Sequence, residues 1–415
     1  MKSLEKFMRK LEPTHDSKWA KFHPVWDALF TFAFTPGETT QKGSHIRDGI
    51  DLKRTMFMVI VALIPCLLFG MYNTGHFHFV AEGTAGGFMD NFGDKLIYGL
   101  IKVLPIVIVS YGVGLGVEFI FCIRNKHAIQ EGFLVTGMLI PLIVPADIPL
   151  WMVAVATVFA VVLGKEVFGG TGMNIVNIAL TARAFLFFGY PTMMSGDKVW
   201  MSGITDVPKD TLDANGVTGA TQLGELASFT GPQEDWVHQA GTNAISGIQE
   251  TAIQAFESAW PIWESFVGII PGSIGETSAL CILIGAAVLL YTGIGSWKIM
   301  TSLVICGLAV GFLANATAVN EYMQLDPMNH LVIGGFLFGA VFMITDPVSG
   351  AQTSTGKYIY GFLGGALSIT IRVFNGAYPE GVMMAILFMN VMAPMIDHYV
   401  LQSNIKRRLK RLKTA

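Results

Sequence analysis

The stretch LIYGLIKVLPIVIVSYGVGLGVEFIFC, residues 96–122, holds 27 residues and only two charged side chains, Lys102 and Glu118. A helix needs about 20 apolar residues to cross a hydrocarbon core about 30 Å thick. Strands are a poor alternative, because an isolated strand leaves backbone groups unpaired in lipid and a transmembrane barrel needs alternating apolar residues. The stretch therefore predicts a transmembrane helix, in which Lys102 reaches outward along the helix surface.

Composition extends this class to the whole chain of 415 residues. Hydrophobic residues make up 52% of the chain and charged residues 14%, and the mean hydropathy is +0.53. Soluble domains carry about 25% charged residues, so we expect much of this chain to face a lipid bilayer. The net charge of -3 argues neither for nor against nucleic acid, and no nucleic-acid partner is expected. The segments predicted to span the membrane are residues 55–72, 96–122, 132–144, 148–163, 174–188, 277–292, 299–315, 330–345, 358–374 and 381–401.

Charge predicts the orientation of this all-α integral membrane protein. Residues 1–54 hold ten Lys or Arg, and the tail 402–415 holds six. An even number of spans places both termini on one side, which the positive-inside rule makes the cytoplasmic side. Residues 189–276 carry two Lys against eleven Asp or Glu and are predicted to be a periplasmic loop.

The predicted loop separates two halves of five helices each, residues 55–188 and 277–401. An odd number of spans gives the halves opposite orientations, the inverted-repeat plan of many transporters. The third and eighth segments are short and end near proline, and the fifth and tenth follow glycine-containing breaks. Interrupted spans at matching positions predict a binding site between the halves, although ordinary loop-forming glycine and proline explain them equally well.

The acidic residues near the cytoplasmic ends of the spans are candidates for function. Glu118, Asp346 and Asp397 lie there, and ionisable residues in membrane segments are costly. Carboxylate oxygens suit a small cation, whereas pairing with lysine is the structural alternative. Arg183 and Arg372 are expected to pair with these acids or to contact an anionic or carbonyl ligand. The four cysteines lie in apolar runs without C-x-x-C spacing and are expected to be buried and unlinked.

The loop contains a second polar signal, the segment NGVTGAT at residues 215–221. Residue types alone indicate a turn. Its place in a predicted periplasmic loop makes it resemble the flavinylation sequence of redox-driven ion pumps, in which the last threonine carries FMN through a phosphoester bond.

Nearly the whole chain resembles the B subunits of the sodium-translocating NADH:quinone oxidoreductases (Nqr). The D subunits of Rnf complexes share the core and the flavinylation sequence but lack the long N-terminal segment, and they rank second. The matching stretches include SHIRD (44–48), GKEVFGGTG (164–172), RAFLFF (183–188), PGSIGE (271–276), TDPVS (345–349), YPEG (378–381) and NIKRRL (404–409).

This resemblance implies two flavins. A flavin transferase would attach FMN to Thr221, the last residue of the sequence Thr218-Gly219-Ala220-Thr221. A non-covalent riboflavin would lie at Asn174 and Asn177, two amides expected to share a helix face. The chain departs from the family pattern at Asn215, where the family has Asp, and at Ile178, where it has Pro.

The resemblance also implies a quinone site, with ubiquinone or another quinone as substrate, at Gly114, beside Leu115 where the family has a second glycine. The ion residues that it implies are Glu118 and Asp397, with Asp346 and Asp27 as weaker candidates.

The implied function is that of a membrane flavin subunit that passes electrons from FMN to riboflavin to quinone and drives sodium outward. The implied partners are an NADH-oxidising flavin and iron–sulfur subunit, a second subunit with covalent FMN, and small membrane subunits. A passive channel or secondary transporter fits the predicted repeat equally well. In a third hypothesis the chain carries electrons while its neighbours conduct the ion, and the sequence is compatible with sodium or the proton.

Overall fold

The computed structural model describes residues 52–125, 132–207, 219–227, 252–376, 378 and 380–414, together with scattered positions before residue 52. All the regular elements in these residues are helical, which confirms the predicted class. The main helices of the first half are α3 (Leu52–Ala81), α4 (Phe92–Asn125), α5 (Phe133–Leu142), α6 (Leu150–Gly164) and α7 (Ile178–Gly189). Those that follow are α9 (Gln222–Ala227), α10 (Ala252–Ala259), α11 (Ile262–Val267), α12 (Ala279–Tyr291), α13 (Trp297–Thr317), α14 (Pro327–Val332), α15 (Phe336–Phe338), η8 (Gly339–Met343), α16 (Ser354–Phe374) and α17 (Val382–Thr414).

Five helical stretches in the described residues are long and apolar enough to cross a membrane. They are α3, α4, α13, α17, and α6 with the turn that follows it, while α5, α7 and α12 are apolar but shorter. Many side chains on these helices are large, apolar and exposed, as lipid contact requires. The chain is therefore a helical membrane protein.

The segment predicted at residues 330–345, one of the short and interrupted segments, is not one continuous helix. The helix α14 stops at Val332, a short α15 follows, and η8 is a turn of π-helix. The break lies at Gly334, whose φ of +67° cannot continue a right-handed helix. Irregular backbone at this depth is tolerated where it is buried in protein or lines a cavity.

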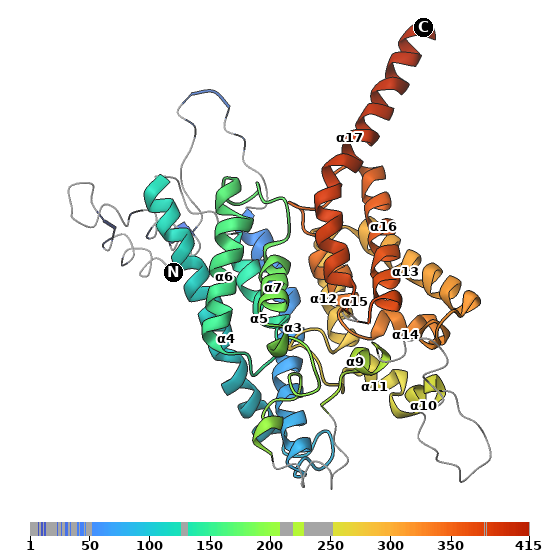
Figure 1. Ribbon diagram of the computed structural model, residues 1–415. Coiled ribbons are helices and arrows are strands. Elements are labelled where there is room, and N and C mark those ends of the chain that lie inside the picture. Colours follow the sequence, from blue (N-terminus) through green and yellow to red (C-terminus); the bar gives the residue numbers. More distant parts are fainter. Residues whose placement is uncertain are drawn as a thin grey trace.

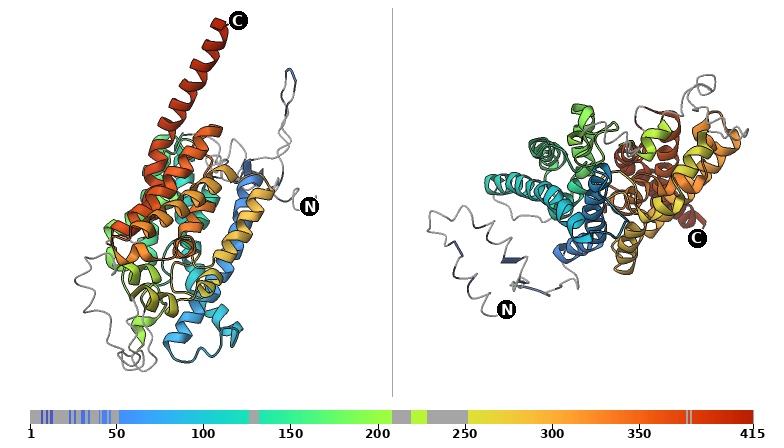
Figure 2. Two further views of the ribbon diagram at one scale, coloured as in Figure 1. Left: turned by 90° about the vertical axis from the view of Figure 1, so that its right-hand side faces the viewer. Right: turned by 90° about the horizontal axis from the view of Figure 1, so that it is seen from below.

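Helices from the two halves lie side by side, as Figure 1 and the view from below in Figure 2 show. Within the first half α6 packs between α4 and α7, and within the second half α16 packs between α13 and α17. The halves meet where α3 packs on α12 and where α7 touches α17.

Glycine permits the closest of these helix contacts. A Cβ added at Gly99 on α4 would lie 1.7 Å from the Met71 carbonyl oxygen on α3. In the second half a Cβ at Gly365 on α16 would lie 2.4 Å from the Leu303 carbonyl oxygen on α13. Small residues let membrane helices approach backbone to backbone, which is a principal source of packing energy in lipid.

The described helices of residues 189–276 and the basic tail lie at opposite ends of this bundle. The helices α9, α10 and α11 gather at the lower end in Figure 1, and the exposed basic end of α17 projects from the upper end. We call the α9 to α11 end the outer end and the other the inner end.

Candidate functional site

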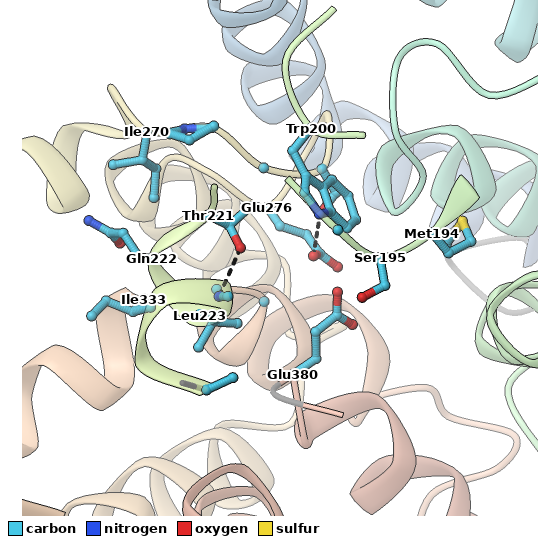
Figure 3. A pocket seen from close by; sticks show the side chains of 18 of the residues that line it. Met194, Ser195, Trp200, Thr221, Gln222, Leu223, Ile270, Glu276, Ile333 and Glu380 are labelled. Carbon is cyan, nitrogen blue, oxygen red and sulfur yellow. Dashed lines mark hydrogen bonds between the residues drawn. The ribbon is translucent and has the colours of Figure 1, made fainter. Parts of the chain in front are cut away.

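A cavity of about 250 Å³ opens between the two halves at the outer end, and we call it the outer cavity. Figure 3 shows its walls, to which α9, the segment before α12, the break after α14 and the segment before α17 all contribute. The side chains and glycines that define it include Trp200, Thr221, Ile270, Glu276, Gly334 and Tyr378.

Thr221 lies on the wall of the outer cavity and is half-buried. Its hydroxyl oxygen accepts a hydrogen bond from the Gly224 N–H at 3.1 Å, which holds Thr221 at the start of α9. Two residues earlier, a Cβ added at Gly219 would lie 1.8 Å from the Asp197 carbonyl oxygen. The backbone can therefore pass so close to Asp197 only with glycine here, and this contact sets the position of Thr221. Thr218 and Asn215 lie outside the described residues.

A buried group of charges forms the floor of the outer cavity. Arg183 on α7 donates to Glu276 at 2.8 Å and to Glu380, and Ser273 donates to the other oxygen of Glu276. The two carboxylates approach from the segments before α12 and before α17 (Figure 3). This ion pair therefore ties the first half to the second at the outer end.

Burial, opposed by the attraction of Arg183 and assisted by the nearby Glu380, raises the pKa of Glu276 to about 7. One guanidinium serves two carboxylates, so the group favours keeping a proton. Neither glutamate was predicted from the sequence as a site residue. The signal was available, because they stand in the stretches PGSIGE and YPEG that carry the resemblance.

The two arginines do not pair with the acids proposed from sequence. Arg183 pairs with Glu276 and Glu380 instead of Glu118, Asp346 or Asp397. Arg372 is fully buried and donates to the His330 carbonyl oxygen at 2.6 Å. Lys102, expected to reach outward, forms an ion pair with Asp147 at 2.7 Å. The four cysteines are free, as predicted.

A second cavity, of about 100 Å³, lies toward the inner end and is lined by both halves; we call it the inner cavity. Asn174 and Asn177 both line it, from the segment that leads into α7. Lys165 and Thr136 add polar groups from the first half, and Asp346 adds a carboxylate from the second. The structure therefore places the two predicted amides together with one predicted ion residue.

The prediction that the two amides share a helix face is wrong. Asn177 caps α7 by accepting from the Leu180 N–H at 3.2 Å, so the helix begins at Ile178. Asn174 precedes the helix, and its amide donates to the Val176 carbonyl oxygen at 3.1 Å. Ile178 is the first helical residue, where proline is readily accommodated. Its exchange for the family's proline therefore leaves the cap intact.

Glu118 is paired with a lysine, the alternative that the sequence left open. Lys165 donates to one oxygen of Glu118, and both side chains are buried, with exposed fractions of 2% and 3%. The second oxygen of Glu118 has no hydrogen-bond partner among the described residues. Lys165 also lines the inner cavity, so the pair joins the wall of that cavity to the buried face of α4.

The predicted ion residues do not form one ligand set. Asp346 accepts from the Ser349 hydroxyl at 2.7 Å and from the Val348 N–H at 3.1 Å. Asp397 on α17 accepts from the backbone N–H groups of Gln352 and Thr353, at 2.7 and 3.0 Å, just before α16. Within the described part of the chain no three His, Cys, Asp or Glu side chains are grouped for a metal ion. Asp27 lies outside the described residues.

Gly114, the predicted quinone residue, lies inside α4 and lines neither cavity. A Cβ there would lie 1.8 Å from the Phe133 ring, so the glycine admits this ring of α5 against α4. Its quinone role stays a prediction.

Known proteins resemble the chain over almost its full length. The model of the NQR2, RnfD, RnfE family matches residues 39–406. The B subunit of the Na(+)-translocating NADH-quinone reductase of Chromohalobacter salexigens is 43% identical over 97% of this chain and 95% of its own length. The B subunits of the same enzyme from Stutzerimonas stutzeri and Klebsiella pneumoniae are 42% and 41% identical, each over 98% of this chain and 99% of its own length. This chain, a helical membrane protein, therefore belongs to the NQR2, RnfD, RnfE family.

Proposed function

We propose that this chain is the flavin-carrying membrane subunit of a sodium-translocating NADH:quinone oxidoreductase. The names of its relatives support the complex and its reaction. The observation that carries the flavin proposal is the position of Thr221, because the last residue of the flavinylation sequence lines a cavity between the two halves. In a transporter without a cofactor, nothing would require this threonine to line a cavity.

The residues around Thr221 fit a covalently attached FMN. An esterified threonine oxygen can still accept the hydrogen bond from Gly224, so attachment leaves the start of α9 in place. The volume of the outer cavity, about 250 Å³, is close to the lower limit of about 300 Å³ for small-molecule sites. The rings of Phe187 and Tyr378, with centroids 4.5 Å apart, and the indole of Trp200 offer aromatic surface for a flat ring system. FMN in this place would supply single-electron and hydride chemistry.

The polar groups of the inner cavity fit the edge of a riboflavin ring. Asn174, Asn177 and Lys165 offer amide and ammonium groups, and Leu139 and Phe342 offer apolar surface. The free volume of about 100 Å³ is below that of a typical ligand site, so side chains in the walls would have to change rotamer to admit the ring.

The two cavities lie at opposite ends of α7. Phe187, near its last residue, lines the outer cavity, and Asn177, its cap, lines the inner one. Ten residues of helix cover about 15 Å. The proposed order of electron carriers, from FMN to riboflavin to quinone, would follow α7 from the outer to the inner end, with the quinone close to Gly114.

The proposal includes a membrane arrangement and partners. The shared packing of α4, α6 and α7 and of α13, α16 and α17 supports two inverted five-helix repeats. Both termini would face the cytoplasm of a cell with an inner membrane. Thr221 would face outward, where a flavin transferase reaches it. Partner subunits would deliver electrons from NADH, and sodium would leave on the outer side.

Mass spectrometry of the peptide that contains Thr221, prepared from the native complex, tests the proposal. We expect the mass of one esterified FMN on that peptide and a fluorescent band after denaturing electrophoresis. The variant Thr221→Ala should lose both signals. The exposed Thr192 lies at the same end of the molecule, and Thr192→Ala should keep them. An unmodified Thr221 in native complex would contradict the flavin role and leave the transporter hypothesis in place.

A further inference from the structure

The last part of α17 leaves the bundle as an exposed helix. Asp397 holds α17 to the backbone just before α16. Beyond it the helix continues to Thr414 and points away from the bundle, as Figure 1 and the left view of Figure 2 show. Every residue from 401 to 412 is exposed. We call residues 401–412 the α17 extension.

One face of the α17 extension is apolar. Its large apolar side chains have exposed fractions of 52%, 49%, 53% and 74%, and they belong to Leu401, Ile405, Leu409 and Leu412. Spacings of four, four and three residues place these side chains in one stripe of a helix with 3.6 residues per turn. The stripe is about 16 Å long, at 1.5 Å per residue. Exposed apolar patches that polar residues surround mark interaction sites, so we expect a partner to cover this stripe.

The rest of the α17 extension is basic. It carries Lys406, Arg407, Arg408, Lys410 and Arg411, and no Asp or Glu follows Asp397 in the sequence. Like charges four residues apart, such as Lys406 and Lys410, destabilise a helix by about 0.2–0.5 kcal/mol per pair. The positive-inside rule explains basic residues after the last span, but orientation does not require an apolar stripe among them. Acidic groups on a partner would compensate these charges, whereas a second copy of this helix would add to the repulsion.

The stripe extends too far from the bilayer for lipid to cover it. Asp397 marks the inner boundary of the span, because a charged side chain is costly in the hydrocarbon core. Leu409 lies about 18 Å beyond Asp397 along the helix, whereas the headgroup layer on each side is only about 5–8 Å thick. A sharp bend could lay the stripe on the membrane. Sharp bends in helices arise mainly at proline, glycine or π-bulges, and α17 has none of these after Pro394.

We propose that the α17 extension docks into a groove of a water-soluble partner subunit at the inner end, and that this groove has an apolar floor and acidic rims. An amphipathic helix binds such a groove through anchors on one face, at the spacing that the stripe shows. The relatives of this chain are named as subunits of an enzyme. The inference rests on the part of the proposed function that makes this chain one of several subunits, and it does not depend on the flavins.

Photo-cross-linking in the native complex, within its membrane, tests the docking. The photoreactive residue p-benzoylphenylalanine replaces Ile405 or Leu409 on the stripe. Ser403 is the matched control position, because two residues on a helix lie about 200° apart and Ser403 therefore faces away from Ile405. The two stripe positions should form adducts with a soluble subunit, through a peptide rich in Asp and Glu that mass spectrometry identifies. Ser403 should form far less of this adduct.

Several outcomes of this experiment would overturn the docking. They are adducts with lipid alone, with a second copy of the chain or with its own N-terminal segment, equal adducts from Ser403, and no adduct at all. A chain that purifies from native membranes without any other subunit would instead contradict the proposed complex, which is a distinguishable failure.

Charge placed on the stripe should release the partner. The double variant Leu409→Glu with Leu412→Glu should lower the amount of soluble subunit that purifies with the chain about tenfold or more, because truncated or charged anchors in an apolar groove dominate the loss of affinity. Ser403→Glu with Asn404→Glu adds the same two charges outside the stripe and should keep the subunit bound. Raising the ionic strength should weaken the unaltered interaction, because salt screens the basic residues. Full retention of the subunit by the stripe variant would contradict the proposal.

Discussion

At the scale of single residues, polar side chains between the two halves decide what the outer cavity can do. The Gly224 N–H holds the Thr221 hydroxyl. The chain just before Thr221 passes close to the Asp197 carbonyl oxygen, which is possible only because Gly219 has no side chain. Arg183 compensates two carboxylates at once, so one negative charge is in excess when both are ionised. This excess of negative charge adds to burial in raising the pKa of Glu276.

Glu276 should make the stability of the protein depend on pH near neutrality. Its pKa is raised from an ordinary value of 4.5 to about 7, so folding favours the protonated form. The stabilisation is fully present below pH 4.5 and is lost as the pH rises through 7. Between pH 6 and 8 the unaltered protein should lose about 1.4 kcal/mol relative to Glu276→Gln, which cannot ionise. Thermal unfolding of the two proteins at both pH values measures this difference. Parallel changes in both proteins would show that Glu276 does not titrate in this range.

At the scale of elements, caps and glycines determine where the helices begin and end. Asn177 starts α7, and Gly334 ends the helical run after α14. The continuous apolar runs predicted the helices themselves, because 20 apolar residues in lipid have few other structures. The break at residues 334 and 335 was not predicted, since two adjacent glycines inside an apolar run do not reveal whether φ is positive there. The helix cap at Asn177 was not predicted either, because the resemblance implied that this amide binds riboflavin.

Asp397 should act chiefly by holding the segment before α16, whose N-cap is Thr353. Its carboxylate accepts from Gln352 and Thr353 across the contact between α16 and α17. Asp397→Ala should reduce stability by about 1–2 kcal/mol, because two backbone N–H groups lose a charged acceptor. Asp397→Asn keeps an acceptor and should lose much less. Thermal unfolding separates the two variants, and sodium titration of turnover tests the ion role. A loss of sodium dependence in Asp397→Asn without a loss of stability would favour the ion role over the structural role.

At the scale of the whole molecule, the two ends of the bundle differ in charge. The outer end holds the acidic segment and Thr221, while the inner end holds the basic helix end of α17. The charge bias of such ends sets the orientation of membrane proteins. The opposite placement of Thr221 and the basic tail is therefore the basis of the proposed sidedness.

Cysteine labelling in intact cells should establish that sidedness. The exposed Thr192 lies at the outer end and the exposed Ser403 lies on the inner extension of α17. A membrane-impermeant maleimide should label Thr192→Cys from outside and should label Ser403→Cys only after the cells are broken. Three native cysteines are buried and Cys281 is partly exposed, so the unaltered protein supplies the background. Labelling of Ser403→Cys from outside would reverse the proposed orientation.

The sequence by itself determined the helical membrane class, the separation of acidic and basic segments, and the stretch that contains Thr221. These features are local, because they depend on the length of apolar runs, on charge counts and on short motifs. Only the tertiary structure decided that Arg183 meets Glu380, 197 residues away, that Lys165 holds Glu118, and that Asp397 binds the backbone just before α16. Such partners depend on how close helices approach one another. That distance is set by packing between residues far apart in the chain, on which no local pattern reports.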